Sequence, residues 1–309
     1  MIHFIHLKDI PAKDLRKILV DAKKRKQKRS KLNTLQKDKD KPLKGKLLIQ
    51  MFEKSSLRTR LSFYLAIKQL GGGTITLRSN ELHLGEGGES LEDTAKILST
   101  YGDGFMLRTD SDHKVDSFKK YLSIPVINGL SPSSHPTQVL SDIFTVEEIK
   151  KKLISKLNIA WIGDCNNVLN SLIAASVKFS FKLSIGCPKK YEPKKFILDW
   201  VKSNNKKIHI FNNAKNAATN ADVIFSDKVI SLNDKVDKTK KLKNFEKFRV
   251  DKKLMSYAKK DCTFLHCLPR GTEVEDKVFR SSQSKVWLQA LNRVHVQKSI
   301  LLYCFGKLR

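Results

Sequence analysis

The sequence predicts an α/β fold of two domains, each built on a mainly parallel sheet with helices on both faces. The chain has 309 residues, more than one compact core usually holds, and its apolar fraction of 40% suits globular packing. Short apolar runs of strand length alternate with segments of helical periodicity, which is the pattern of repeated βαβ units. Such units form parallel sheets because each crossover returns the chain to the same edge.

In the first half of the chain, apolar spacing switches between the helix and strand patterns. Helices are expected over residues 14–31, 56–70, 91–101 and 139–151, and strands over residues 47–52, 72–77, 104–107 and 125–128. Ser90 and Asp93 have the spacing of a capping box at the third helix, with aspartate in place of glutamate. The polar residues 33–44 and the glycine-rich residues 80–90 are expected to form loops.

The second half repeats the alternation more regularly. Strands are expected over residues 158–162, 182–185, 207–211, 223–225 and 263–266, and helices over residues 170–179, 193–202, 214–220 and 292–306. A lysine-rich loop and a short helix are expected between the last two strands. This order predicts a parallel sheet in the second domain.

The turn after the strand over 47–52 carries the strongest signal for a ligand. Lys54, Ser56, Arg58 and Thr59 place cations and hydroxyls beside the unpaired N–H groups of a helix start, where anions bind. The alternative is an ordinary N-cap followed by a solvated cation. No Gly-x-x-x-x-Gly-Lys-Ser/Thr motif precedes the turn, so a phosphate is favoured over a nucleoside triphosphate.

Six polar segments directly follow predicted strands. They are residues 54–59, Arg108, residues 135–138, residues 164–167, Asp227 and residues 266–269. Open α/β sheets bind their ligands at this carboxyl edge, so we expect both domains to contribute to one cleft. Only Gly163 follows the strand over 158–162, which excludes the Gly-x-Gly-x-x-Gly motif of a dinucleotide site.

Several of these side chains suit a small anionic ligand. His135 and Gln138 offer donors to a carbonyl oxygen that gains charge, although a histidine in a Ser/Pro-rich loop is often incidental. Cys267 is either a small core residue or a nucleophile, and no neighbouring base favours the second role. Asn166 and Asn167 either cap a helix or present amides to a ligand. Three arginines could bind a dianion in bidentate geometry, or they could be surface cations. They are Arg58, Arg108 and Arg293.

Composition narrows the class of protein. The formal charge of +29 is concentrated in two lysine-rich stretches with few aromatic residues, which favours a solvated surface over nucleic-acid binding and leaves weak polyanion affinity or substrate steering open. Five cysteines without a C-x-x-C pair argue against a disulfide framework and a zinc site. The absence of a membrane-length apolar run and of a signal peptide predicts a cytoplasmic protein that has no membrane partner.

Over nearly its whole length, the chain resembles the aspartate/ornithine carbamoyltransferase family, and within it the ornithine enzymes. The motifs that carry the resemblance are FEKSSLRTR, HLG…ESLEDTAKILS, IPVINGLSPSSHPTQVLSD, WIGDCNNVLNS, DVIFSD, FLHCLPR and NRVHVQKSILL. The phosphate turn and HPTQ are shared with aspartate carbamoyltransferase, whereas GDCNN and HCLP are typical of the ornithine enzymes. Each motif is weak alone, and together they are highly specific.

The resemblance implies roles for individual residues. Carbamoyl phosphate would be bound by Ser56, Leu57, Arg58, Thr59, His83, Arg108, His135, Pro136, Thr137, Gln138, Cys267, Leu268 and Arg293. Ornithine would be bound by Asn167, Asp227, Ser231 and Leu232, and the implied catalytic residues are Arg108, His135, Asp227 and Cys267. The position of His83 resembles one that reaches the ligand from a neighbouring subunit, so a homotrimer with shared active sites is expected. No metal and no organic cofactor is implied.

The expected domains are residues 1–138 for carbamoyl phosphate, residues 139–290 for ornithine, and residues 291–309 as a C-terminal helix that packs back on the first domain. The implied reaction is carbamoyl transfer to the δ-amine of L-ornithine, which gives L-citrulline and phosphate.

Four departures from the family pattern leave alternatives open. Leu57 replaces threonine, Leu291 replaces glutamate, the glycine-rich loop is one residue longer, and residues 227–233 read DKVISLN in place of Asp-x-Trp-x-Ser-Met-Gly. The last change keeps open a carbamoyltransferase for putrescine or an N-acylated ornithine. A polyanion-binding protein that retains the fold is the alternative from another class.

Overall fold

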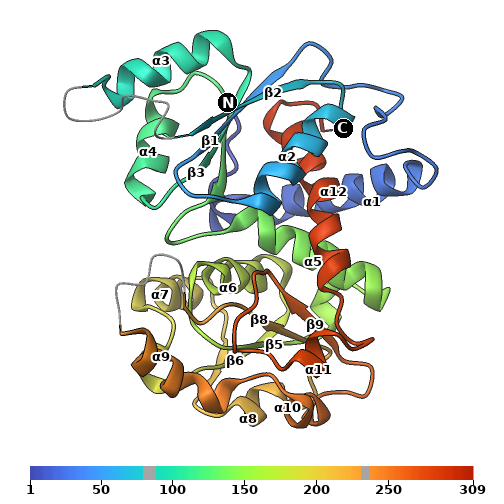
Figure 1. Ribbon diagram of the computed structural model, residues 1–309, viewed down its shortest axis with the longest axis vertical. Helices are drawn as coiled ribbons and strands as arrows, with labels where there is room; N and C mark the ends of the chain where they lie inside the picture. Colours follow the sequence, from blue (N-terminus) through green and yellow to red (C-terminus); the bar gives the residue numbers. More distant parts are fainter. Residues whose placement is uncertain (79–87, 231–236, 309) are drawn as a thin grey trace. The chain divides into compact units, whose positions relative to one another are not determined.

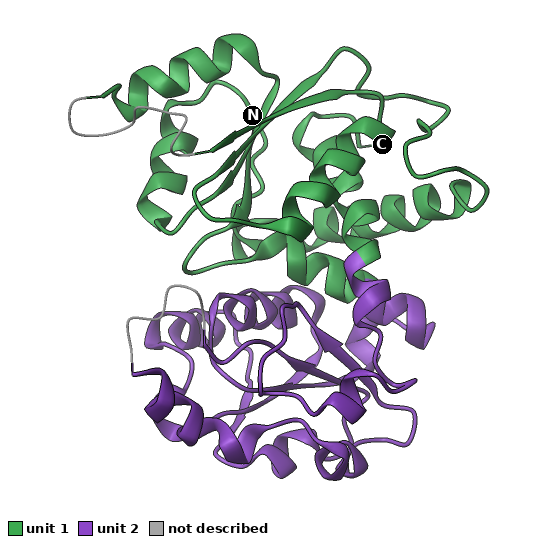
Figure 2. Ribbon diagram, viewed as in Figure 1, with its two compact units in different colours: residues 1–144, 291–309 green, residues 145–290 purple. Residues whose placement is uncertain are grey.

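The protein is described here by a computed structural model that covers residues 1–78, 88–230 and 237–308. The chain divides into two compact units, residues 1–144 with 291–309 (unit 1) and residues 145–290 (unit 2), shown in Figure 2. The sequence placed the first boundary between residues 138 and 139. In the structure the division lies inside a helix, between Phe144 and Thr145.

Unit 1 is built on a four-stranded parallel sheet in the order β2-β1-β3-β4 (Figure 1). Its strands are β1 (Leu47–Phe52), β2 (Gly73–Arg78), β3 (Gly104–Arg108) and β4 (Val126–Leu130). Its helices are α1 (Ala12–Lys28), α2 (Leu57–Gln69), α3 (Leu91–Tyr101) and α4 (Asp112–Tyr121), with the first part of α5 (Pro136–Lys150), most of α12 (Val286–Cys304) and the 3-10 turn η1 (Leu7–Asp9). The predicted parallel α/β architecture is therefore confirmed.

The helices α3 and α4 cover one face of this sheet, and α1, α2 and α12 lie on the other side (Figure 1). The rings of Phe105 in β3 and Phe118 in α4 pack with their centroids 4.9 Å apart. Helix α4 was not predicted, because only Val115 and Phe118 of its ten residues are buried and two positions give no periodic pattern.

The C-terminal helix α12 packs on unit 1, as predicted, and it begins at Val286 rather than at residue 292. Its polar side chains bond to the first helix and the loop that follows it. Lys298 Nζ pairs with Asp38 at 2.6 Å, and Ser299 Oγ donates to Asp21 over 2.6 Å. These contacts hold the two ends of the chain together within one unit.

Unit 2 is built on a five-stranded parallel sheet in the order β7-β6-β5-β8-β9. Its strands are β5 (Asn158–Ile162), β6 (Lys182–Gly186), β7 (His209–Phe211), β8 (Val223–Ser226) and β9 (Thr263–His266). Its helices are α6 (Asn167–Phe179), α7 (Lys195–Ser203), α8 (Ala214–Ala218), α9 (Lys238–Phe245), α10 (Lys252–Tyr257) and α11 (Asp276–Phe279), with 3-10 turns η3 (Ile154–Lys156), η4 (Lys189–Tyr191) and η5 (Glu246–Phe248). Among the described helices, none has the length and apolar character needed to cross a membrane.

Strand order places a topological switch point in each sheet. In unit 1 the chain goes from β1 to β2 on one side and then to β3 on the other side of β1. In unit 2 it runs from β5 through β6 to β7 and returns as β8 on the far side of β5. Open α/β sheets bind ligands in the crevice at the carboxyl ends of the strands that flank this point.

Candidate active site

The switch point of unit 1 brings the end of β1 beside the end of β3. Phe52 and Arg108 are partners in the sheet register, and the N–H of Glu53 donates to the carbonyl of Arg108 over 3.0 Å. Two residues after the Phe52–Arg108 pair on each segment, the ammonium group of Lys54 pairs with the carboxylate of Asp110 at 3.2 Å. The predicted phosphate turn therefore lies next to Arg108, because the turn follows β1 and Arg108 ends the neighbouring central strand β3.

Helix α2 begins at Leu57, and its N-cap is Ser56 in an extended conformation. Within the part of the chain that the structure describes, the Ser56 side chain accepts no capping hydrogen bond from the helix. Leu57 is 71% exposed and its apolar side chain offers no hydrogen-bond donor, so the donors available at this turn are the backbone N–H groups of the helix start. The positive end of the helix dipole then lies beside the cations of the turn, as expected for an anion site.

Three distant segments meet in a buried hydrogen-bond network. Arg293 in α12 donates from Nη2 to Thr59 Oγ1 over 2.7 Å and from Nη1 to Gln138 Oε1 over 2.8 Å. The amide nitrogen of Gln138 donates in turn to Asp142 over 2.8 Å. Thr59, Gln138 and Arg293 are each at most 2% exposed, so the network excludes water.

His135 lies beside this network, immediately before α5. Its side chain is buried, and burial followed by the positive charges of Arg293, Arg108 and Arg58 lowers its pKa well below the ordinary value. The imidazole is therefore neutral at pH 7. A neutral histidine among three guanidinium groups can donate a hydrogen bond without adding a charge, while the arginines attract an anion.

Helix α5 begins at Pro136, so residues 136–138 form the first turn of a helix and not the loop that the sequence predicted. The N–H of Val139 donates to the carbonyl of His135 over 3.2 Å, which closes that turn. Proline suits the first helical position because it has no N–H group to leave unpaired. The earlier start directs Gln138 toward Arg293, and Thr137 is completely buried.

The switch point of unit 2 is organised around the carboxylate of Asp227, directly after β8. Asn166, from the turn after β5, donates from Nδ2 to Asp227 Oδ2 over 2.6 Å. The thiol of Cys267, directly after β9, donates to Asp227 Oδ1 over 2.7 Å. Asp227 is 8% exposed, so one nearly buried carboxylate joins the ends of three neighbouring strands.

A buried pair supports the backbone of the Cys267 turn. The N–H of Leu268 donates to His266 Nδ1 over 2.9 Å, so the other ring nitrogen of His266 carries the proton that faces Glu273 Oε1 at 3.0 Å. Burial acts to raise the pKa of Glu273, but hydrogen bonds from His266 and from the Gly271 N–H bring that pKa below its ordinary value. The pair fixes the turn that presents Cys267 to Asp227.

The sequence matches two profiles that describe one family. The profile described as "Aspartate/ornithine carbamoyltransferase, carbamoyl-P binding domain" matches residues 2–148, and the profile for the Asp/Orn binding domain matches residues 155–304. The chain belongs to the aspartate/ornithine carbamoyltransferase family. This result confirms the resemblance seen in the sequence motifs.

Full-length relatives of this carbamoyltransferase family member are similar to it over their whole chains. Ornithine carbamoyltransferase from Agrobacterium fabrum is 39% identical over 306 residues, which covers 98% of each chain. The Brucella suis protein of the same name is 41% identical and covers 98% of this chain and 95% of its own. The solved structure of ornithine carbamoyltransferase from Pyrococcus furiosus has a TM-score of 0.90 at 36% identity, covering 98% of this chain and 97% of that chain.

For this carbamoyltransferase family member, the structure groups the predicted site residues in two sets. Thr59, Arg108, His135, Gln138 and Arg293 lie at or beside the switch point of unit 1. Asp227 and Cys267 meet in unit 2, where Asn167 is the first residue of α6 and Leu268 follows Cys267. His83, Ser231 and Leu232 lie outside the described residues.

The sequence did not single out Glu53 or Lys241, and it left the role of Asn166 open. Glu53 accepts hydrogen bonds from the Thr109 hydroxyl and from Lys114 Nζ, beside Arg108. The sequence pattern gave Asn166 two possible roles, a helix cap or an amide for a ligand. Lys241 lies in the lysine-rich residues 235–253, for which a solvated surface was expected. Lys241 is 6% exposed and pairs with Asp164 over 2.7 Å. A buried lysine in a lysine-rich stretch has no distinguishing sequence signal.

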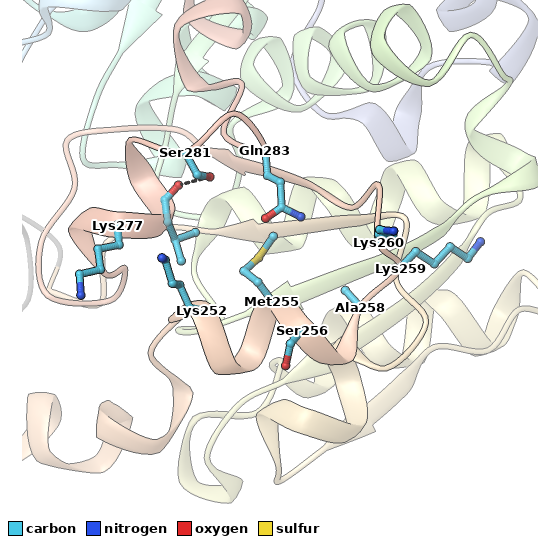
Figure 3. Close-up of a pocket in the computed structure, with 10 residues that line it drawn as sticks. Lys252, Met255, Ser256, Ala258, Lys259, Lys260, Lys277, Ser281 and Gln283 are labelled. Carbon is cyan, nitrogen blue, oxygen red and sulfur yellow. Dashed lines mark hydrogen bonds between the residues drawn. The ribbon is translucent and has the colours of Figure 1, made fainter.

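A cavity of about 490 Å³ in unit 2 has none of the predicted site residues in its described lining (Figure 3). Its lining includes Met255 and the four lysines Lys252, Lys259, Lys260 and Lys277. These residues come from α10, from the segment that enters β9 and from α11, so the cavity lies toward the amino end of β9. Among the described residues, no group of three or more His, Cys, Asp or Glu side chains is arranged to hold a metal ion.

Proposed function

We propose that this protein is an ornithine carbamoyltransferase, which transfers the carbamoyl group of carbamoyl phosphate to the δ-amine of L-ornithine and releases L-citrulline and phosphate. The observation that carries the proposal is the buried network of Thr59, Gln138 and Arg293 beside a neutral His135. Its chemistry suits a ligand with a dianionic phosphate and a polar carbonyl group. The names of the relatives supply the substrate pair.

Carbamoyl phosphate binds at the switch point of unit 1 in this proposal. The N–H groups at the start of α2, with Arg58 and Arg108, hold the phosphate, because helix N-termini and guanidinium groups both favour a dianion. Thr59, His135 and Gln138 surround the carbamoyl group. The fixed network means that these groups need little reorganisation when charge develops.

The reaction needs positioning and electrostatics alone. The neutral δ-amine attacks the carbamoyl carbon, a C–N bond forms, and the carbonyl oxygen becomes an anion. The Thr59 hydroxyl, Arg108 and His135 stabilise that oxygen. The C–O bond to phosphate then breaks, and the departing phosphate is basic enough to take the proton that the nitrogen loses.

Ornithine binds at the switch point of unit 2 in this proposal. The described bonds give each oxygen of Asp227 one donor, which leaves lone pairs for a substrate ammonium group. Asn167, in the first turn of α6, offers its amide and the helix N-terminus to the substrate carboxylate. Ser231 and Leu232 complete the ornithine site by family resemblance.

We also propose that the protein acts in the cytoplasm as a homotrimer whose subunits share active sites. Leu57, Leu61 and Tyr64 are spaced by about one turn along α2 and are 71%, 51% and 39% exposed. Ile75, on the edge strand β2, is 50% exposed. We propose that a second copy covers this apolar surface, and by family resemblance His83 is assigned to the phosphate site of the neighbouring subunit. Light scattering of the purified protein measures the predicted mass of three chains.

The function is tested by measuring citrulline formation from carbamoyl phosphate and L-ornithine. We expect kcat/KM for ornithine to exceed the values for putrescine and N-acetylornithine by about 100-fold or more, because buried polar groups reject analogues that leave them unpaired. A higher kcat/KM for putrescine or N-acetylornithine than for ornithine would show that this analogue, and not ornithine, is the substrate. Retained binding of nucleic acid in high salt, without citrulline formation, would favour the polyanion-binding alternative.

A further inference from the structure

Asn166 bonds with both ends of its amide to different elements of unit 2. Its Oδ1 accepts hydrogen bonds from the N–H groups of Val168 and Leu169, at 3.0 and 3.2 Å, and so caps α6. Its Nδ2 donates to Asp227 Oδ2 over 2.6 Å. The two helix N–H groups need an acceptor and the carboxylate needs a donor, so these partners determine which way the amide faces.

Asp227 is held from two directions as a result. Asn166 acts on one oxygen from the turn after β5, and Cys267 acts on the other from the turn after β9. Beneath it, Ser226 Oγ donates to the carbonyl of Ile162 over 2.8 Å and joins β8 to β5. A carboxylate with both oxygens occupied by donors from different strands has one preferred plane, and that plane sets where an ammonium group can bind.

We propose that Asn166 is a positioning residue for the amine substrate, which fixes the plane of the Asp227 carboxylate through the capped start of α6. Asn166 does not touch the substrate in this proposal. Because its oxygen is fixed by the N–H groups at the start of α6, its amide nitrogen holds the carboxylate of Asp227, which binds ornithine in this proposal, in one orientation. The inference rests on the proposed role of Asp227 and goes beyond it, because it assigns a residue that acts through Asp227.

Asparagine combines these two functions at this position, whereas aspartate and serine each retain only the cap. Aspartate is an equally good N-cap, but it would place a second carboxylate against Asp227 and force the pair to share a proton. Serine also caps a helix, but its short side chain has no amide that reaches Asp227. The two roles of Asn166 can therefore be separated by substitutions that keep the cap.

The experiment compares Asn166→Asp, Asn166→Ser and Asp227→Asn in the full chain. Asn213→Asp is the matched control, because Asn213 caps α8 in the same unit through the N–H of Lys215 at 2.8 Å and, among the described hydrogen bonds, makes none to Asp227. KM is measured for each substrate, kcat/KM for ornithine is measured from about pH 5 to about pH 9, and Tm is recorded for each variant.

We expect Asn166→Asp to raise KM for ornithine about tenfold or more, with KM for carbamoyl phosphate within about twofold, because a hydrogen bond to a charged group is lost. It also moves the acidic fall of kcat/KM to higher pH, since the paired carboxylates protonate more readily. Asn166→Ser raises the same KM without that displacement. The control leaves both substrates and the pH profile unchanged.

Several outcomes would overturn the inference. Unchanged ornithine kinetics in both Asn166 variants, while Asp227→Asn raises KM for ornithine, would remove Asn166 from the site and leave the role of Asp227 intact. An unchanged KM for ornithine in Asp227→Asn would instead show that Asp227 does not bind ornithine, which would contradict the proposed ornithine site itself. Equal losses for both substrates with a lowered Tm would assign Asn166 a purely structural role. If Asn166→Asp fails to fold, Asn166→Ser decides the question by its KM values.

Discussion

Arg293, near the end of the chain, donates to the hydroxyl of Thr59 in the first turn of α2, over 2.7 Å and across 234 positions of sequence. The same guanidinium donates to Gln138 in the first turn of α5. One buried cation thus bridges two helix starts whose side chains are proposed to surround the carbamoyl group. The geometry of the site in unit 1 depends on a residue from the last helix.

Arg293→Lys is expected to weaken carbamoyl phosphate binding by about 10- to 100-fold, because an ammonium group cannot replace two fixed guanidinium bonds. Calorimetric titration with carbamoyl phosphate measures this loss. Arg249→Lys is the matched control, since Arg249 is exposed. Equal affinities for Arg293→Lys and the unsubstituted chain would show that the bridge does not organise the ligand site.

His135 should make the protein less stable in acid. Burial and nearby arginines lower the pKa of His135 well below 6.5, so below about pH 6.5 the unfolded chain takes up a proton that the folded chain does not. The free energy of unfolding then falls by up to about 1.4 kcal/mol per pH unit from this group. Tm measured at about pH 7 and about pH 5 should fall less in His135→Asn than in the unsubstituted chain. Equal falls would contradict a neutral, buried His135.

The thiol of Cys267 is expected to assist Asp227 as a donor. Cys267→Val removes the donor at nearly constant volume and should raise KM for ornithine about three- to tenfold, whereas Cys267→Ser keeps a donor and should change KM less. Steady-state kinetics with both substrates measures the difference. Cys262→Val serves as the control, because Cys262 is a buried cysteine of the same unit that precedes β9. A larger effect for serine than for valine would rule out the donor role.

Glu273→Ala should destabilise unit 2 by about 2–4 kcal/mol, because it leaves the N–H of a completely buried His266 without its charged partner. It should also raise KM for ornithine, since His266 supports the turn that presents Cys267. Chemical denaturation and kinetics measure the two effects. Asp276→Ala is the control, because the ion pairs of Asp276 with the described residues Arg270 and Arg280 are exposed, and such pairs contribute little to stability. Similar losses in both variants would refute the buried pair.

Local signals in the sequence were sufficient for most elements. The apolar runs predicted β1, β5 and β9 with the bounds that the structure has, and the spacing of Ser90 and Asp93 predicted the cap of α3, where Ser90 Oγ accepts from the Asp93 N–H over 3.1 Å. Elements with few buried residues, such as α4, had no such signal. The start of α5 was misplaced because polar Thr137 and Gln138 resemble a loop, whereas both are buried.

The sequence by itself determined the fold class, the family motifs and the residue types that a carbamoyl transfer needs, because these depend on short-range periodicity and on motif identity. The tertiary structure decided which side chains meet. Asn166 and Asp227 are 61 positions apart, and Thr59 and Arg293 are 234 apart. Contacts over such separations follow from strand order and from the return of α12, and apolar spacing along one segment carries no information about its neighbours in space.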